Sequence, residues 1–127
     1  MLEIIWFLSI LFAIHYVADF FIQVYTWKKS SQLVRNLIIH TIAYLFVITF
    51  GLIVLGAVFP NQHITHVNML GFLGVNAVAH FITDFIVKKV SKVLHHYNEI
   101  TAFVNIVALD QCIHYITLML TFGWFFL

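Results

Sequence analysis

The stretch Asn76–Lys89, NAVAHFITDFIVKK, places a polar residue at every fourth position of an otherwise apolar and aromatic segment. If the segment is helical, Asn76, His80, Asp84 and Lys88 lie on one stripe of the helix, because residues four apart are neighbours on its surface. A histidine and an aspartate on the same helical stripe are the feature around which the rest of the sequence can be interpreted.

The same pattern occurs earlier, at residues 15–23 (HYVADFFIQ). When this stretch is aligned with HFITDFIVK at residues 80–88, the His, the Asp and the following Phe are identical. The earlier pair is His15 and Asp19, and Gln23 follows one step further along the stripe. We therefore expect two repeated helical hairpins, whose first helices run in the same direction.

The composition excludes an ordinary soluble domain. Of the 127 residues, 63% are hydrophobic and 9% are charged, and the mean hydropathy is +1.03, whereas about a quarter of the residues of a soluble domain are charged. Apolar stretches reach the roughly 20 residues that a helix needs to cross a bilayer. The sequence predicts an all-α polytopic membrane protein, a single four-helix domain over residues 1–127, with helices over residues 2–26, 34–58, 67–90 and 100–126.

The basic residues predict the orientation of this bundle. All six of them flank the first and third turns between helices: Lys28, Lys29, Arg35, Lys88, Lys89 and Lys92. By the positive-inside rule, both turns lie in the cytoplasm and both termini lie outside a bacterial inner membrane. The first span is expected to be retained, because Glu3 replaces the basic start of a signal peptide. A net charge of +1 is too small to suggest nucleic acid as a partner.

Ionisable residues occur inside all four predicted helices. A single ionised Asp at a helix centre costs about 2.5–3.5 kcal/mol on the insertion scale, so three cost on the order of 8–10 kcal/mol. They must be protonated, hydrogen-bonded, hydrated or neutralised by a cation. We expect them to converge in the cytoplasmic half of the bundle: His15, Asp19, His40, His80, Asp84, Asp110 and His114.

Several interpretations of this cluster are open. Imidazoles and carboxylates together favour a divalent metal such as Zn, Mn or Fe, with carboxylates that also orient the imidazoles. The polar stripe could instead be a proton or ion path, or helix packing alone. Haem ligation by two facing histidines would leave the aspartates unexplained. Cys112 is expected to be a packing residue, with a thiolate ligand as its alternative.

For the metal interpretation we predict three groups of residues. The ligands are His15, His40, His80, Asp84 and His114. Asp19 and Asp110 act as ligands or as the general base that activates water. The supporting residues are Gln23, Asn76, Lys88 and Gln111.

The combined motifs, HxxxDFxxQ at residues 15–23, His40, NxxxHxxxD at residues 76–84 and DQxxH at residues 110–114, resemble the domain of unknown function 3307 family. Its members are small bacterial and phage membrane proteins. The resemblance covers most of the chain and supports the architecture and the choice of polar positions, but its name implies no reaction. A looser similarity to bacterial inner-membrane proteins described as metal-dependent hydrolases slightly favours a metal.

The favoured function is metal-assisted hydrolysis or transfer on a membrane-soluble substrate, such as a lipid-linked phosphate. Lys28, Lys88 and Lys89 would then steer an anionic headgroup, or would only mark the topology. The alternative is a small transport or accessory membrane protein, acting as a homo-oligomer. The outer halves of the helices are nearly all apolar, as in residues 48–58 and 116–127, which counts against a conduit.

Overall fold

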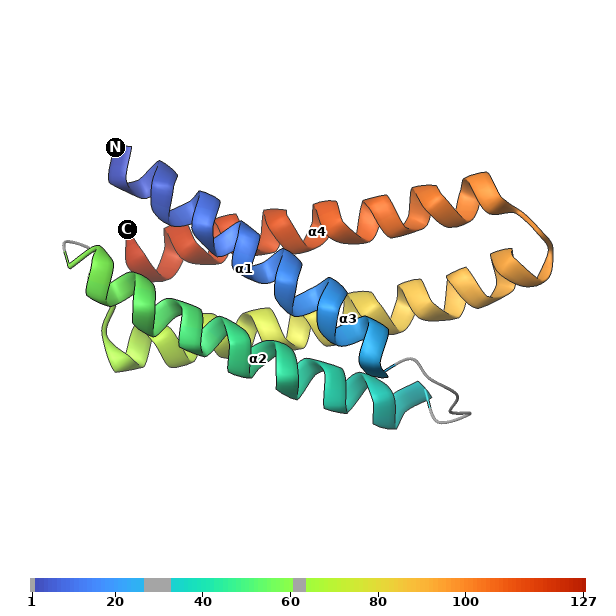
Figure 1. The fold of residues 1–127 in the computed structure, drawn as a ribbon, viewed down its shortest axis with the longest axis horizontal. Helices are drawn as coiled ribbons and strands as arrows, with labels where there is room; N and C mark the ends of the chain where they lie inside the picture. The colour runs from blue at the N-terminus through green and yellow to red at the C-terminus, as the bar shows by residue number, and fades with distance from the viewer. Residues whose placement is uncertain (1, 27–32, 61–63) are drawn as a thin grey trace.

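The computed structural model describes residues 2–26, 33–60 and 64–127, without the side chains of residues 21–26. The described chain forms four helices: α1 (Leu2–Thr26), α2 (Leu33–Val58), α3 (His66–His96) and α4 (Ile100–Phe126). They run alternately up and down, and both termini lie at the same end (Figure 1). All four are long and apolar enough to cross a membrane. The predicted all-α fold of four membrane-spanning helices is therefore confirmed.

Helix α3 is longer than predicted. We expected it to end at residue 90, but it continues to His96 and ends where Asn98 takes a positive φ of 61°. The segment SKVLHH contains neither Gly nor Pro, so the lysines before it mark a change in polarity and not a helix end. At 1.5 Å per residue, a helix of 31 residues is about 46 Å long, against about 30 Å of hydrocarbon. The α3–α4 hairpin extends past α1 and α2 at the end away from the termini (Figure 1).

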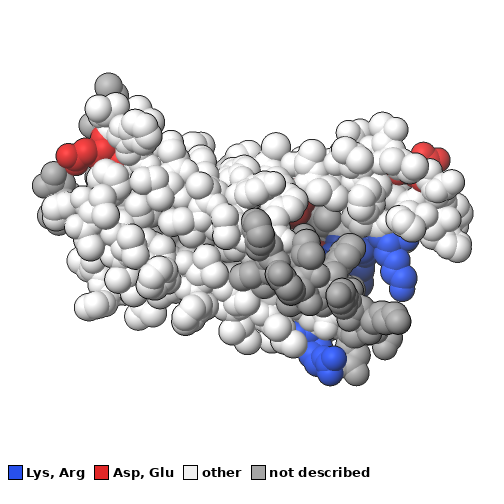
Figure 2. All heavy atoms as spheres, in the orientation of Figure 1, with Lys and Arg blue, Asp and Glu red and all other residues white. Residues whose placement is uncertain are grey.

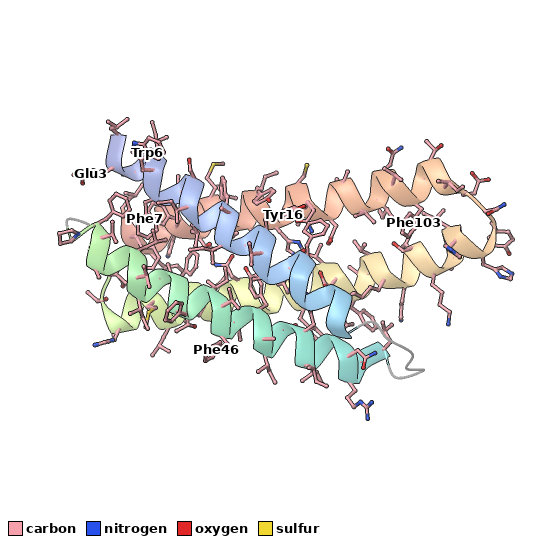
Figure 3. All side chains as sticks on the ribbon, in the orientation of Figure 1. Glu3, Trp6, Phe7, Tyr16, Phe46 and Phe103 are labelled. Atoms are coloured by element: carbon pink, nitrogen blue, oxygen red, sulfur yellow. The ribbon has the colours of Figure 1, made fainter. Side chains whose placement is uncertain are left out.

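An apolar core fills the half of the bundle nearer the termini. Phe7 of α1 is fully buried and packs against Phe122 of α4, with ring centroids 4.9 Å apart. Other large apolar side chains point outward. Phe46 and Trp124 are 75% and 84% exposed, and Figure 3 shows Phe46 directed away from the bundle and Phe7 directed into it. Exposed aromatic and aliphatic side chains all around the helices suit a lipid environment.

Charged atoms are sparse on the surface. In the view of Figure 2 the Lys and Arg atoms lie toward the end opposite the termini. The described basic residues are Arg35 near the start of α2 and three lysines in the second half of α3. Lys28 and Lys29 lie outside the described residues. The two ends thus differ in charge as predicted, whereas their assignment to cytoplasm and exterior stays a prediction.

Candidate metal centre

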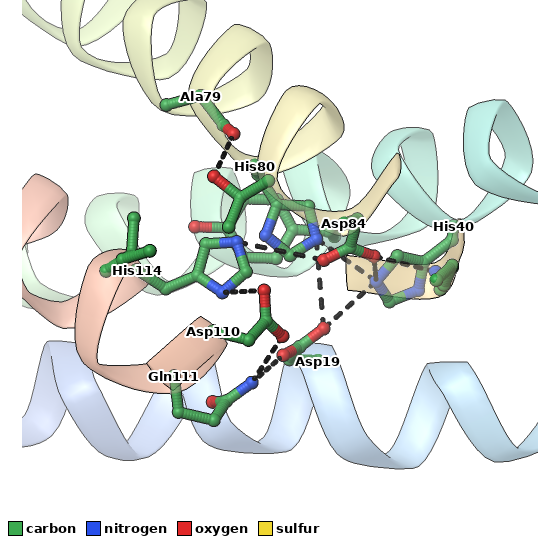
Figure 4. Close-up of polar contacts among 12 residues, drawn as sticks. Asp19, His40, Ala79, His80, Asp84, Asp110, Gln111 and His114 are labelled. Atoms are coloured by element: carbon green, nitrogen blue, oxygen red, sulfur yellow. Dashed lines mark hydrogen bonds and ion pairs between the residues drawn. The ribbon is translucent and has the colours of Figure 1, made fainter. Parts of the chain in front are cut away.

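Seven ionisable side chains from the four helices meet inside the bundle, next to the apolar core. Figure 4 shows six of them, Asp19, His40, His80, Asp84, Asp110 and His114. Each is at most 5% exposed. Their spacing explains the convergence, because residues four apart in α1, α3 and α4 face the same direction. The seven are the residues predicted as ligands or bases: His15, Asp19, His40, His80, Asp84, Asp110 and His114.

The closest contacts surround Nε2 of His40. This atom lies 3.0 Å from Oδ1 of Asp19, 3.5 Å from Oδ2 of Asp84 and 3.1 Å from Nε2 of His80. A neutral imidazole nitrogen carries either one proton or one lone pair, so it cannot satisfy three neighbours at once. Ligand atoms of Asp19, His40, His80 and Asp84 all lie within 4.8 Å of one another. These four residues, called the primary group below, could hold one metal ion.

The remaining residues lie on the α4 side of the primary group. Nε2 of His114 is 3.7 Å from Oδ1 of Asp84, and its Nδ1 is 3.8 Å from Oδ1 of Asp110. Both distances are too long for hydrogen bonds. The ring of His15 lies 5.4 Å from that of His114. Two further sets of ligand atoms lie within 4.8 Å of one another, His15–Asp19–His114 and Asp84–Asp110–His114.

Tyr44 belongs to the site, although it is not among the residues predicted for it. Its ring stacks on that of His80, with centroids 4.1 Å apart and planes 5° from parallel. Its hydroxyl lies 3.4 Å from Nδ1 of His15. This contact leaves Nε2 of His15 as the nitrogen available to a ligand. The signal was present in the sequence, because Tyr44 follows His40 by four residues and so shares its stripe.

The predicted supporting residues have different surroundings. Gln111 donates a hydrogen bond to Asp19 at 2.6 Å, and Lys88 donates one to Oδ2 of Asp84 at 2.7 Å. Asn76 lies outside the cluster and donates to Oγ1 of Thr121, which ties α3 to α4. Gln23 has no described side chain.

Two other expectations find no support in the described residues. Cys112 is exposed, so its thiol lies outside the buried cluster and is not a ligand there. The carboxylates expected to orient the imidazoles do not do so through Nδ1 of His40 or Nδ1 of His80, because these two nitrogens have no hydrogen-bond partner in the described part of the chain.

Charge is unbalanced within the cluster. Three carboxylates contribute three negative charges when ionised, and the ammonium group of Lys88, which contacts Asp84, contributes one positive charge. Among the described residues, two negative charges are then left uncompensated if the histidines are neutral. One divalent cation would balance them, as would protons on two of the histidines or carboxylates.

Equivalent residues of the two repeats take related places. His15 of α1 corresponds to His80 of α3, and their ring centroids lie 6.1 Å apart. Each repeat also pairs its aspartate with a histidine of the following helix, His40 at 3.0 Å from Asp19 and His114 at 3.7 Å from Asp84. The ring of His80 lies 5.1 Å from that of His40, close to the 5.4 Å between His15 and His114. The cluster is therefore approximately symmetric.

No family model, curated protein or solved structure matches the chain. The resemblance to the domain of unknown function 3307 family accordingly stays a prediction.

Proposed function

We propose that the chain binds a divalent metal ion inside the membrane and uses it for hydrolysis or transfer on a lipid-linked phosphate. The observation that carries the proposal is the convergence of the primary group, in which two imidazole nitrogens and two carboxylates face one point. Zn, Mn and Fe all accept this mixture of nitrogen and oxygen ligands. A bound ion would also remove the conflict among the three neighbours of His40 Nε2.

A bound divalent cation supplies an activated water and polarises a phosphoryl oxygen. The residues of the chain position the reactants around it. Asp19 lies among the ligand atoms of the primary group, which favours a ligand role. Asp110 lies outside that group and is the remaining carboxylate that could accept a proton from water. Gln111 contacts both aspartates, at 2.6 Å and 3.4 Å, and so fixes their relative positions.

An apolar groove on the outside of the bundle lies beside the site, along the same turns of α2 and α3. It lies between α2 and α3 and has a volume of about 250 Å³, and it is lined by Ile38, Thr41, Ile42, Ala77, Val78, Phe81 and Ile82. Thr41 directly follows His40, and Ala77 and Phe81 flank His80 along α3. Its outer rim is lipid-facing, since Ile42 and Val78 are 61% and 60% exposed. A lipid chain in this groove would lie against the turns of α2 and α3 that carry His40 and His80.

The two alternatives account for less of the arrangement. A proton or ion path needs polar groups that continue through the bundle, but beyond the cluster and the Asn76–Thr121 pair the described interior is the apolar core around Phe7, Leu52, Phe72 and Phe122. Helix packing explains the hydrogen bond between Asn76 and Thr121 but not the crowding at His40. The metal proposal addresses the crowding and the charge imbalance together.

Lipid access gives a prediction for Ala77. The Ala77→Phe variant should fill the groove and lower phosphate release from phosphatidic acid in detergent micelles at least about tenfold, with the metal content unchanged. Ala108→Phe on α4 is the matched control, because Ala108 is exposed and lies outside the groove. Equal rates in the two variants would remove the groove from the proposal. A metal-loaded wild type that releases no phosphate would contradict hydrolysis of this substrate class.

The proposed orientation places the charged end of the bundle in the cytoplasm. Reporter fusions after Ser30 and Asn98 should therefore read cytoplasmic, and fusions after Asn61 and at the C-terminus should read external. The split of six basic residues at one end to none at the other is the reason. An external reading at Asn98 would invert the orientation and place the long α3–α4 hairpin outside the cell.

A further inference from the structure

Four buried ligand-type atoms stay without hydrogen-bond partners in the described part of the chain and lie on the α4 side of the primary group. They are Nε2 of His15, Oδ1 of Asp84, Oδ1 of Asp110 and Nε2 of His114. A buried polar atom without a partner costs about 1–3 kcal/mol. A metal ion bound to Oδ2 of Asp84, the oxygen that faces His40, would leave these four atoms without a partner.

The carboxylate of Asp84 faces both the primary group and the unpartnered atoms near His114. Its Oδ2 lies 3.5 Å from Nε2 of His40 on α2, and its Oδ1 lies 3.7 Å from Nε2 of His114 on α4. A carboxylate with one oxygen directed at each of two separate imidazoles is suited to bridge two ions. Asp19 is likewise shared, because it belongs to the primary group and to the set with His15 and His114.

The repeat also indicates a second position for an ion. Exchanging the two hairpins exchanges His15 with His80, Asp19 with Asp84, and His40 with His114. The histidines of the primary group, His40 and His80, then become His114 and His15. A second position on the α4 side is thus the counterpart of the primary group within an approximately symmetric cluster.

We propose that the cluster holds two divalent ions that share Asp84. The first ion is held by the primary group. The second is held by His114 together with Asp84 and Asp110, one set of ligand atoms within 4.8 Å of one another, and by His15, which forms another such set with His114 and Asp19. This inference rests on the proposed metal binding and extends it to a dinuclear centre. Paired ions in a bundle of four helices with carboxylate and histidine ligands form a known type of site. Two divalent ions bring four positive charges against the two negative charges that the described cluster leaves uncompensated, so an anionic ligand is needed to balance the other two, and a lipid-linked phosphate supplies it. Two ions can also stabilise both the attacking and the leaving oxygen of a phosphoryl group.

The second ion changes the role of Asp110 from a base to a ligand. The Asp110→Asn variant separates the two roles. A ligand role predicts that the variant loses one of two bound ions, whereas a base role predicts that both ions stay and only activity falls.

Manganese titration tests the proposal on the wild-type protein, purified in detergent without chelator. Two Mn²⁺ per chain are expected, and the second equivalent should convert the six-line paramagnetic resonance spectrum of isolated Mn²⁺ into the broad spectrum of a coupled pair. This measurement needs no variant and does not depend on the folding of one. Saturation at one Mn²⁺ per chain with an isolated spectrum would overturn the second ion and leave the proposed function standing. Failure to bind Mn²⁺, Zn²⁺ or Fe²⁺ would overturn both.

Variants then locate the two ions. His114→Gln should remove the second ion, which halves the stoichiometry to one Mn²⁺ per chain and restores the six-line spectrum. His40→Gln should have the same two effects by removing the first ion. His95→Gln is the matched control, because His95 is exposed near the end of α3, and it should keep two ions. A His114→Gln protein that keeps a coupled pair would contradict the assignment of His114.

Discussion

Replacing Phe122 by alanine is expected to lower the free energy of unfolding by about 3–5 kcal/mol. Phe122 is 1% exposed, and its ring packs between those of Phe7 and Phe126, at 4.9 Å and 5.5 Å between centroids. Removing it leaves a cavity in the apolar core that the neighbouring helices cannot fill. Unfolding by titration with sodium dodecyl sulfate in mixed micelles measures the change.

Trp124→Ala is the control for this experiment. Trp124 lies on the same helix two residues away, but it is 84% exposed and faces lipid, so its removal should change the free energy of unfolding by less than about 1 kcal/mol. Equal effects of the two variants would mean that α4 does not present this face to the bundle. The register of α4 in the candidate site, including His114 and Asp110, would then be wrong.

Much of the architecture could be predicted from the sequence because one strong physical constraint acts on it. In a bilayer every backbone polar group must be satisfied within its own helix, so long apolar stretches become helices of nearly fixed length. The spacing of four then places His80 and Asp84 on one face, and the repeat does the same for His15 and Asp19. A polar stripe in lipid has to turn inward, which is why these residues meet in the structure.

The same reasoning could not distinguish residues along one stripe. Asn76 and Lys88 occupy equivalent positions on the α3 stripe, yet Asn76 bonds to Thr121 and Lys88 to Asp84. Which neighbour a residue contacts depends on where the helices cross, and spacing within one helix does not contain that information. The inclusion of Tyr44 in the site depends on the crossing of α2 with α1 and α3 in the same way.

Removing the charge of Asp84 is expected to weaken metal binding at least about 100-fold. Residues that only orient a ligand contribute about 10–100-fold to affinity, and a direct ligand should contribute no less. Asn keeps the shape of the side chain and a carbonyl oxygen but loses the negative charge that offsets the cation. Elemental analysis of wild type and Asp84→Asn, purified in detergent without chelator, measures the loss.

Lys88 complicates the single variant. Its ammonium group lies 2.7 Å from Oδ2 of Asp84, and its side chain is 8% exposed, so Asp84→Asn leaves a buried charge without its partner. Breaking a buried pair in this way costs about 3–5 kcal/mol, and the loss of stability could be mistaken for a loss of metal. The double variant Asp84→Asn/Lys88→Gln removes both charges, and Lys88→Gln alone is its control, which should keep the metal.

Thermal melting of these variants with and without added ion decides between metal binding and helix packing. A metal at 100 times its dissociation constant stabilises the folded protein by about 2.7 kcal/mol, so Zn²⁺, Mn²⁺ or Fe²⁺ should raise the melting temperature of wild type and of Lys88→Gln. The double variant should not respond. A wild type that is purified without metal and gains no stability from any of these ions would contradict the metal centre. If the double variant then melted higher than wild type, the buried charges would be a cost to the bundle that no ion offsets. The cluster would in that case be assigned to helix packing or to a proton path.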